Sequence, residues 1–298
     1  MTAERQEFSA YLYGLQETIC EALRAFDPAL VVHEDIWERT DHAGDPGGGG
    51  RTRALEGQHI ECGGVNVSAV HGALEPAFAE KLGGAPDDRL FATGISLILH
   101  PRNPRIPTVH MNFRLVAVGD REWVGGGADL TPFYPHREDV LHFHQTWRDA
   151  TEPWGTHDAW KARCDAYFVN HHRGGEMRGV GGIFYDHVNS GDLTADLEMQ
   201  RTLSQQFLES WLPIAQRRRD EPWTAEDEAF MLWRRGRYVE FNLLHDRGTL
   251  FGLRTGGRTE SILVSLPGRC AFAYRPPIAP GSVHEEMMAW YRPRAWLA

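Results

Sequence analysis

Residues 108–118, TVHMNFRLVAV, alternate between apolar and polar side chains with a period of two. This period predicts a β-strand that buries one of its faces. The buried face would carry Val109, Met111, Phe113 and Leu115. The opposite face would carry His110, Asn112 and Arg114. These three side chains supply an acid/base group, an amide that donates and accepts hydrogen bonds, and a permanent cation, so this face can exchange a proton and hold a carboxylate.

A second apolar run precedes this strand and predicts a hairpin. Residues 94–100, GISLILH, place Ser96 and His100 on one face, and a proline-rich turn follows them. Pairing across that turn would bring His100 close to His110 and Ser96 close to Arg114. Cross-strand neighbours have Cβ atoms roughly 5 Å apart, so the two histidines would share one ion or one substrate. The alternative is that both histidines face solvent.

The remaining periodicity predicts helices on both sides of a group of strands. Amphipathic helices are expected at residues 4–25, 137–150, 157–172, 191–217 and 281–291. Further strands are expected at residues 64–70, 236–244, 249–255 and 260–267. The glycine-rich segment 45–53, DPGGGGRTR, is expected to be a mobile loop, and residues 125–135 a turn.

This order of elements favours one α+β domain over residues 1–298, because the chain shows neither an internal repeat nor a long linker. We expect a large antiparallel β-sheet flanked by helical layers. Strands from both halves of the chain would meet in that sheet.

Composition excludes several classes of protein. The chain is 42% hydrophobic and 24% charged, and no apolar run approaches the ~20 residues of a membrane span. A formal net charge of −10 argues against general nucleic-acid binding. The four cysteines are far apart and form no CxxC pair, so we expect reduced thiols and a cytoplasmic protein.

Histidines and arginines are the candidate chemical groups. His100 and His110 from the strands could join one histidine from each of two helices in a four-ligand metal site, although no short metal motif is present. Arginines beside glycines, as in HDRG and TGGRT, suggest a substrate with several carboxylates; surface salt bridges are the alternative. No nucleotide, flavin or pyridoxal phosphate motif occurs, so we expect no organic cofactor.

Several long segments resemble one enzyme family. They are GGGGRTR (47–53), GISLILHPRNPRIPTVHMNFR (94–114), GGGADLTPFY (125–134), RGVGGIFYD (178–186) and RGRYVEFNLLHDRGTLFGLRTGGRTESILVSLP (235–267). They resemble oxygen-dependent coproporphyrinogen III oxidase, and the similarity extends nearly from end to end. The resemblance implies oxidative decarboxylation of two propionates of coproporphyrinogen III to vinyl groups, with O2 as oxidant. It also implies a large antiparallel sheet between helical layers, and a homodimer.

The resemblance also assigns roles to individual residues. It implies substrate contacts at Ser96, Asn112, Phe113, Arg114, Gly256, Gly257 and Arg258. His110 would be a proton donor, and Asp246 with Arg247 would meet the tetrapyrrole. Candidate positions for manganese or another divalent metal are His100, His110, His144 and His172. His171 precedes His172, so either could take that position, and His187 stands where the family more usually has an acidic residue.

Two other functions fit parts of the sequence. One is a metal-dependent oxygenase or decarboxylase that acts on another polycarboxylate and uses a histidine-bound ion to activate O2. The other is a non-catalytic tetrapyrrole carrier, which would keep Arg258 and the pocket without needing His110. Metal analysis of active protein separates the first function from the family's reaction, and turnover separates the second.

Overall fold

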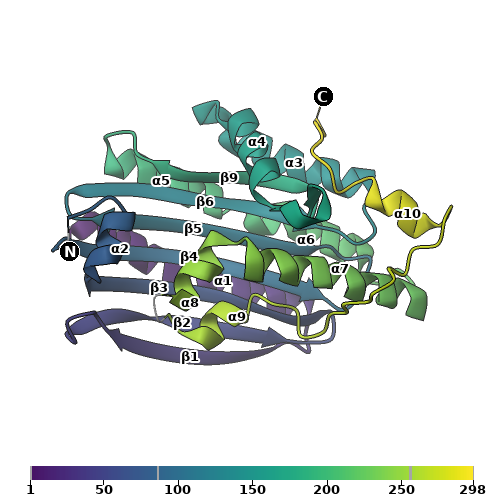
Figure 1. The fold of residues 1–298 in the computed structure, drawn as a ribbon, viewed down its shortest axis with the longest axis horizontal. Coiled ribbons are helices and arrows are strands. Elements are labelled where there is room, and N and C mark those ends of the chain that lie inside the picture. Colours follow the sequence, from purple (N-terminus) through teal and green to yellow (C-terminus); the bar gives the residue numbers. More distant parts are fainter. Residues whose placement is uncertain (1, 86, 255–256, 298) are drawn as a thin grey trace.

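The computed structural model describes residues 2–85, 87–254 and 257–297, and a seven-stranded antiparallel sheet forms its centre (Figure 1). In spatial order the strands are β1 (Val31–Thr40), β2 (Pro46–Glu56), β3 (Ile60–Ala73), β4 (Arg89–Pro101), β5 (Thr108–Val118), β6 (Arg121–Thr131) and β9 (Gly181–Val188). Helical layers flank the sheet, so the predicted α+β class is confirmed. None of the described helices is long and apolar enough to cross a membrane.

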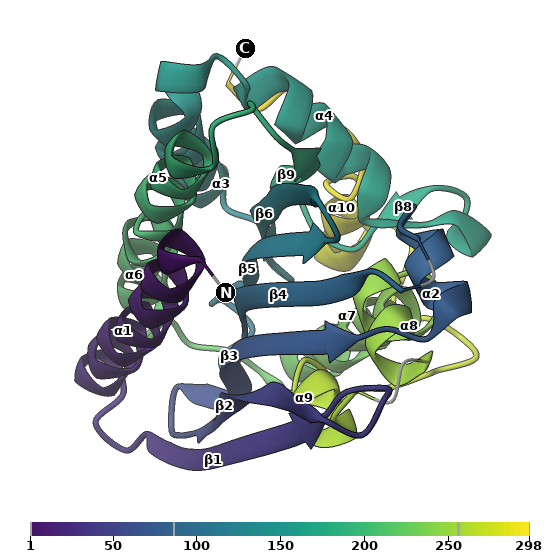
Figure 2. The same cartoon turned by 90° about the vertical axis from the view of Figure 1, so that its left-hand side faces the viewer.

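One face of the sheet packs against the helical layer that forms the main core. This layer consists of α1 (Ala3–Phe26), α3 (Arg137–Thr151), α5 (Leu193–Ser204) and α6 (Phe207–Arg218). Figure 2 shows these four helices together on one side of the strands. The even-odd pattern of β5 places Val109, Met111, Phe113 and Leu115 there, fully buried.

The other face is covered by the C-terminal helices (Figure 2). They are α7 (Ala225–Leu244), α8 (Arg247–Arg254) and α9 (Thr259–Leu263). Smaller elements complete the described chain: α2 (Pro76–Lys81), η1 (Glu152–Trp154), α4 (His157–Tyr167), β7 (Val169–Asn170), η2 (His171–Arg173), β8 (Glu176–Met177) and α10 (Val283–Met288). The polar face of β5 is therefore on the side of the sheet that α7, α8 and α9 cover.

The strands predicted at 236–244, 249–255 and 260–267 are wrong, because the described parts of these segments are mainly helical. Thr224 and Asp227 form a reciprocal capping box that starts α7. From Phe230 to Asn242 this helix is buried on nearly all sides, and the fully buried Arg235 pairs with Glu61 of β3 at 2.5 Å. A helix buried all round lacks the one-sided pattern of a surface helix, so its apolar run looks like a strand.

The segment 45–53 is also not the expected loop, since most of it belongs to β2. Glycines there allow close packing: a Cβ on Gly50 would lie 2.5 Å from a ring carbon of Trp37 and from the carbonyl oxygen of Val67. Residues 125–131, expected in a turn, continue β6. Among the described residues, the strands of the sheet all lie between Val31 and Val188, and the described C-terminal helices cover one of its faces.

The β4–β5 hairpin exists, but its register differs by two residues from the expected one. His110 lies opposite Ile98, and Ser96 lies opposite Asn112. The connection is closed by an Asn103 turn, in which the Asn103 side-chain oxygen accepts from the Arg105 amide at 2.9 Å. A shift of two residues keeps every side chain on its face, so the polar row is preserved while its cross-strand partners change.

Candidate active site

A cavity of about 1020 Å³ lies between the polar face of the sheet and the C-terminal helices. This volume lies at the upper end of the range for small-molecule sites, roughly 300–1,000 Å³. Of the expected site residues, the cavity is lined by Ser96, His110, Asn112, Phe113, Arg114, Asp246, Arg247, Gly257 and Arg258. Gly256 lies outside the described residues. Sequence segments more than 100 residues apart thus meet at one site.

His110 is held by a buried carboxylate. Its Nδ1 lies 2.9 Å from Oδ1 of Asp129, which stands directly opposite it on β6. Burial alone would raise the pKa of Asp129, but Arg178 and His110 outweigh burial and hold that pKa below its usual value. An ionised carboxylate only accepts hydrogen bonds, so the Nδ1 of His110 carries the proton. In the described part of the chain the Nε2 of His110 has no hydrogen bond, so this nitrogen can meet a ligand in the cavity.

Arg178 binds the carboxylate of Asp129 that orients His110. Its guanidinium donates to both oxygens of Asp129, at 3.1 and 2.8 Å, and to the side-chain oxygen of Asn242 at 2.8 Å. The same group lies over the rings of Phe168 and Tyr238, 4.1 and 4.6 Å from their centroids. A buried ion pair with this many hydrogen bonds fixes the position of the carboxylate and, through it, of the imidazole.

Asp246 and Arg247 stand at the start of α8. One Asp246 oxygen accepts from the backbone amide of Thr249 at 2.7 Å, and the other accepts from the Tyr167 hydroxyl at 2.9 Å. Burial, followed by the charge of Asp246, raises the pKa of Tyr167 to about 12, so this phenol stays a donor. The Arg247 guanidinium lies 4.9 Å from the centre of the Tyr167 ring. Tyr167 therefore contacts both Asp246 and Arg247 and fixes their positions at the cavity wall.

The two expected carboxylate-binding arginines already have internal partners. Arg114 lies 2.9 Å from Asp186 and donates to the Asn112 side-chain oxygen at 2.6 Å. Arg258 pairs with Asp35 of β1. A substrate carboxylate at either arginine must therefore share the guanidinium or displace the aspartate. Because a guanidinium group has five N–H donors, Arg114 and Arg258 can each bind a substrate carboxylate while they keep the contact with their aspartate.

Phe113 borders the cavity, but its side chain lies on the other face of the sheet from His110 and Asn112. It is fully buried in the core on the opposite face of the sheet, where its ring lies near those of Trp147 and Tyr185. The alternation that places the side chains of His110 and Asn112 in the cavity directs the side chain of Phe113 into the core.

The structure does not bring the four candidate metal-binding histidines together. Both ring nitrogens of His100 are used within the protein, by the Ser265 carbonyl at 3.0 Å and the Thr108 hydroxyl at 3.3 Å. His144 contacts the Val180 carbonyl at 3.1 Å from within α3, in the helical layer on the core face. In the part of the chain that is described, no group of three or more His, Cys, Asp or Glu side chains could hold a metal ion. These residues therefore do not fit a shared metal site.

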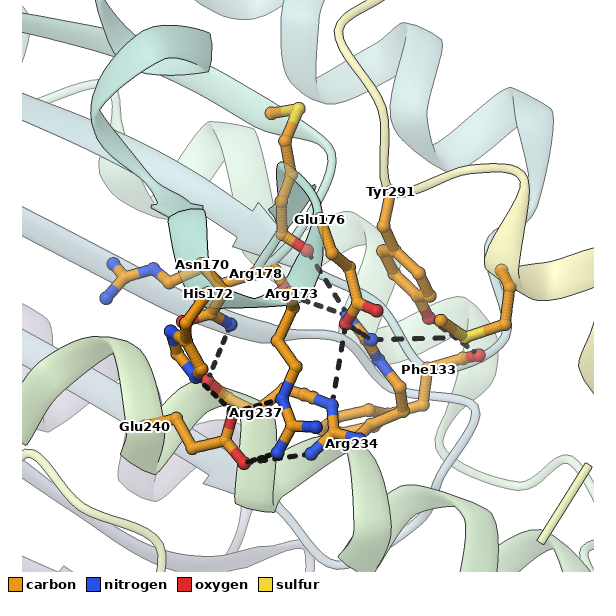
Figure 3. Close-up of polar contacts among 12 residues, drawn as sticks. Phe133, Asn170, His172, Arg173, Glu176, Arg178, Arg234, Arg237, Glu240 and Tyr291 are labelled. Atoms are coloured by element: carbon orange, nitrogen blue, oxygen red, sulfur yellow. Dashed lines mark hydrogen bonds and ion pairs between the residues drawn. The ribbon is translucent and has the colours of Figure 1, made fainter. Parts of the chain in front are cut away.

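His172, the fourth candidate, belongs to a polar network between α7 and residues 170–178. Its Nδ1 lies 2.9 Å from His245, and its Nε2 lies 3.0 Å from Glu240. Figure 3 shows that the same network contains further ion pairs. They are Arg173–Glu240 at 2.7 Å, Arg237–Glu240 at 2.9 Å and Arg234–Glu176. These contacts attach residues 172–176 to α7, and this short segment leads to Arg178.

The buried histidines predict a specific pH dependence of stability. Burial, the largest cause, lowers the pKa of His100 and of His144 to about 3. In the unfolded chain each would titrate near 6.5, so the unfolded state binds more protons between these values. Folding stability is therefore complete above pH ~6.5 and falls as the pH is lowered toward 3, by at most ~1.4 kcal/mol per pH unit for each histidine.

The variant His144→Met tests this expectation, because the Val180 carbonyl still accepts from Trp296 at 3.0 Å. Urea unfolding at pH 7.0 and 5.5 should show a smaller loss of stability for the variant than for the wild type. Equal losses in the two proteins would mean that His144 is protonated in the folded state.

Comparison with protein families gives a match that covers most of the chain. The model of the coproporphyrinogen III oxidase family matches residues 7–296. The chain belongs to this family. Membership places it in porphyrin biosynthesis as an oxidative decarboxylase with coproporphyrinogen III as its substrate. The cavity suits such a substrate, since it combines the volume for a large macrocycle with arginines for its carboxylates.

Three groups that shape the site, Asp129, Tyr167 and Arg178, do not stand out in the sequence. Asp129 lies in the segment 125–135, for which the sequence predicts a turn. In the structure this part of the segment is a strand antiparallel to β5, and the pairing places Asp129 beside His110. Tyr167 ends α4, and Arg178 comes after the short β8. Neither carries a local signal, because each reaches its partner only through the packing of distant segments.

Proposed function

We propose that this chain catalyses the oxygen-dependent oxidative decarboxylation of coproporphyrinogen III to protoporphyrinogen IX in the cavity. The main support is His110, an imidazole oriented by a buried carboxylate, with Nε2 left for a ligand beside arginines and Asp246. The alternative of a non-catalytic carrier gives no reason for this orientation. We further propose that the protein works in the cytoplasm.

The proposed reaction removes a carboxylate and two electrons from each of two propionates. A side chain of the form R–CH2–CH2–COO⁻ reacts with O2 and one proton to give R–CH=CH2, CO2 and H2O2. The C–COO⁻ bond breaks, and its electron pair forms the new C=C bond. The neighbouring CH2 loses hydrogen with its bonding electrons, and these electrons reduce O2. An electron-rich porphyrinogen can itself react with O2, so the chain's residues need only position it and move protons.

The residues divide these tasks in the proposal. His110 is the group that supplies or accepts the proton, because a histidine with an oriented ring can do either near neutral pH. Asp246 accepts hydrogen bonds from pyrrole N–H groups, which steadies positive charge that develops on the macrocycle. Arg247 and Arg258 bind propionates, and Arg114 contributes at the rim.

Turnover with and without oxygen tests this proposal. Purified protein should convert coproporphyrinogen III to protoporphyrinogen IX in air, with one CO2 and one H2O2 for each vinyl group. The conversion should stop under nitrogen and should persist after exhaustive chelation. Conversion under nitrogen, or loss of activity on chelation that added metal restores, would favour a different oxidant or a metal-dependent oxygenase.

Replacement of Arg258 by lysine is expected to weaken substrate binding. Lysine keeps the charge but cannot form the planar two-point contact with a carboxylate. We expect KM to rise about tenfold with little change in kcat, the scale of one lost charge-assisted contact. The exposed Arg24 on α1, replaced by lysine, is the matched control. An unchanged KM in Arg258→Lys would mean that Arg258 serves only its ion pair with Asp35.

We also propose that the protein is a homodimer. Leu243, Leu244 and Leu253 near the α7–α8 junction are exposed in the single chain, and a second subunit would cover apolar surface of this kind. Sedimentation at micromolar concentration should then give about twice the 33.7 kDa chain mass. A single species at the chain mass would contradict a dimer.

A further inference from the structure

The strand β9 carries an irregularity at the rim of the cavity. Asp186 and His187 both stand opposite Gly125 of β6, because the register shifts at this point. Before and after this bulge, Tyr185 and Val188 pack into the core, whereas Asp186 and His187 both line the cavity. A regular strand would have directed His187 toward the core. The bulge therefore turns an additional side chain toward the cavity.

The backbone of His187 is held in an unfavourable conformation. Its φ is +58°, and among the described residues no other non-glycine residue has a positive φ. Two contacts hold it there. The imidazole stacks on Trp123 with the ring centres 4.9 Å apart and the planes 5° apart, and the His187 amide donates to Asp186 at 3.1 Å. Strain of this kind persists where surrounding structure enforces it, and it is concentrated at ligand-binding positions.

The charges at the rim explain what this imidazole can add. Asp186 lies 2.9 Å from Arg114, so the guanidinium is already balanced by one carboxylate. The Nδ1 of His187 lies 3.5 Å from the second oxygen of the same aspartate. The His187 side chain is 65% exposed, and its Nε2 has no hydrogen bond within the described chain. An incoming anion therefore meets Arg114 and His187 on either side of Asp186.

We propose that Arg114 and His187 form a rim subsite that binds one carboxylate of the substrate, with Trp123 as the support for the imidazole. The proposal rests on the function proposed above, since it assumes a substrate with several carboxylates. The bound carboxylate accepts from a free Arg114 donor and from the Nε2 of His187, in the tautomer that carries the proton on Nε2; the Nδ1, 3.5 Å from Asp186, makes no hydrogen bond to it. His187 thereby selects for a substrate that carries a carboxylate at this end of the cavity.

The variants His187→Asn and His187→Gly test the subsite without forcing the backbone to change. Asparagine and glycine both tolerate positive φ, and both remove the imidazole. The control is His33→Asn, because His33 is exposed on β1 and does not line the cavity. Two quantities are measured: KM and kcat with coproporphyrinogen III, and the Kd of coproporphyrin III, the oxidised macrocycle with the same four carboxylates, by fluorescence titration.

Both His187 variants should raise KM and Kd about fivefold, the scale of a partly solvent-screened charged contact, with kcat within twofold of wild type and an unchanged Tm. The His33 control should match wild type. Unchanged KM and Kd in both variants would overturn the subsite, as would a fall in kcat and Tm together, which indicates a structural role. If the wild-type protein binds coproporphyrin III but does not turn over coproporphyrinogen III, the proposed reaction is wrong. The Kd values of the two His187 variants then still test the subsite. Wild-type protein that neither binds nor reacts would reject both.

Discussion

Replacing His110 by alanine is expected to lower kcat at least ~10²-fold, the usual scale for loss of a general acid or base. The Kd of the substrate should change by only a few-fold, because the arginines that bind carboxylates remain. Single-turnover measurements at saturating substrate separate the two quantities. A kcat within threefold of wild type would remove His110 from proton transfer.

A companion variant, Asp129→Asn, tests how His110 is held. The amide of asparagine can present a donor to Nδ1, which would favour the tautomer with the proton on Nε2. We therefore expect kcat to fall in the same direction as for His110→Ala, with KM little affected. If Asp129→Asn lowered stability but left kcat intact, the buried pair would serve the fold alone.

Replacing Arg178 by methionine is expected to lower the free energy of unfolding by ~3–5 kcal/mol, because Asp129 would remain buried without its cation. Arg178 and Asp129 are both almost completely buried, and they share two hydrogen bonds. Urea unfolding at pH 7 measures the loss.

The double variant Asp129→Asn with Arg178→Met provides the matched control. It removes the uncompensated charge, so its loss should be smaller than the sum of the two single losses. Additive losses, or a loss below ~1 kcal/mol in Arg178→Met alone, would show that the pair does not stabilise the fold as described.

Periodicity predicted the parts of the fold that have one buried and one open face. Residues 108–118 are β5 with its odd-numbered side chains in the core, and residues 4–25 lie within α1. The C-terminal elements could not be assigned in this way. In α7 even Arg234 and Arg235 are buried, with Glu176 and Glu61 as partners, so the pattern no longer reports which side faces water.

From the sequence, only the site residues that lie on one strand could be predicted together. The row that includes His110 and Asn112 was visible from β5 alone, and the cavity contains both. Its supporting groups, Asp129 and Arg178, depend on register and on packing between distant segments. The metal-site expectation shows the limit clearly: His144 has a suitable side chain, but α3 packs it into the core on the opposite face of the sheet.

The most direct test of the account is a crystal structure with coproporphyrin III bound. We expect the macrocycle in the cavity between the sheet and α8, with the Nε2 of His110 within hydrogen-bond distance of one substituent and Asp246 facing the pyrrole nitrogens. At least one carboxylate should contact Arg258 or Arg114. A macrocycle bound elsewhere, or one in the cavity with its propionates directed away from His110, would contradict the account.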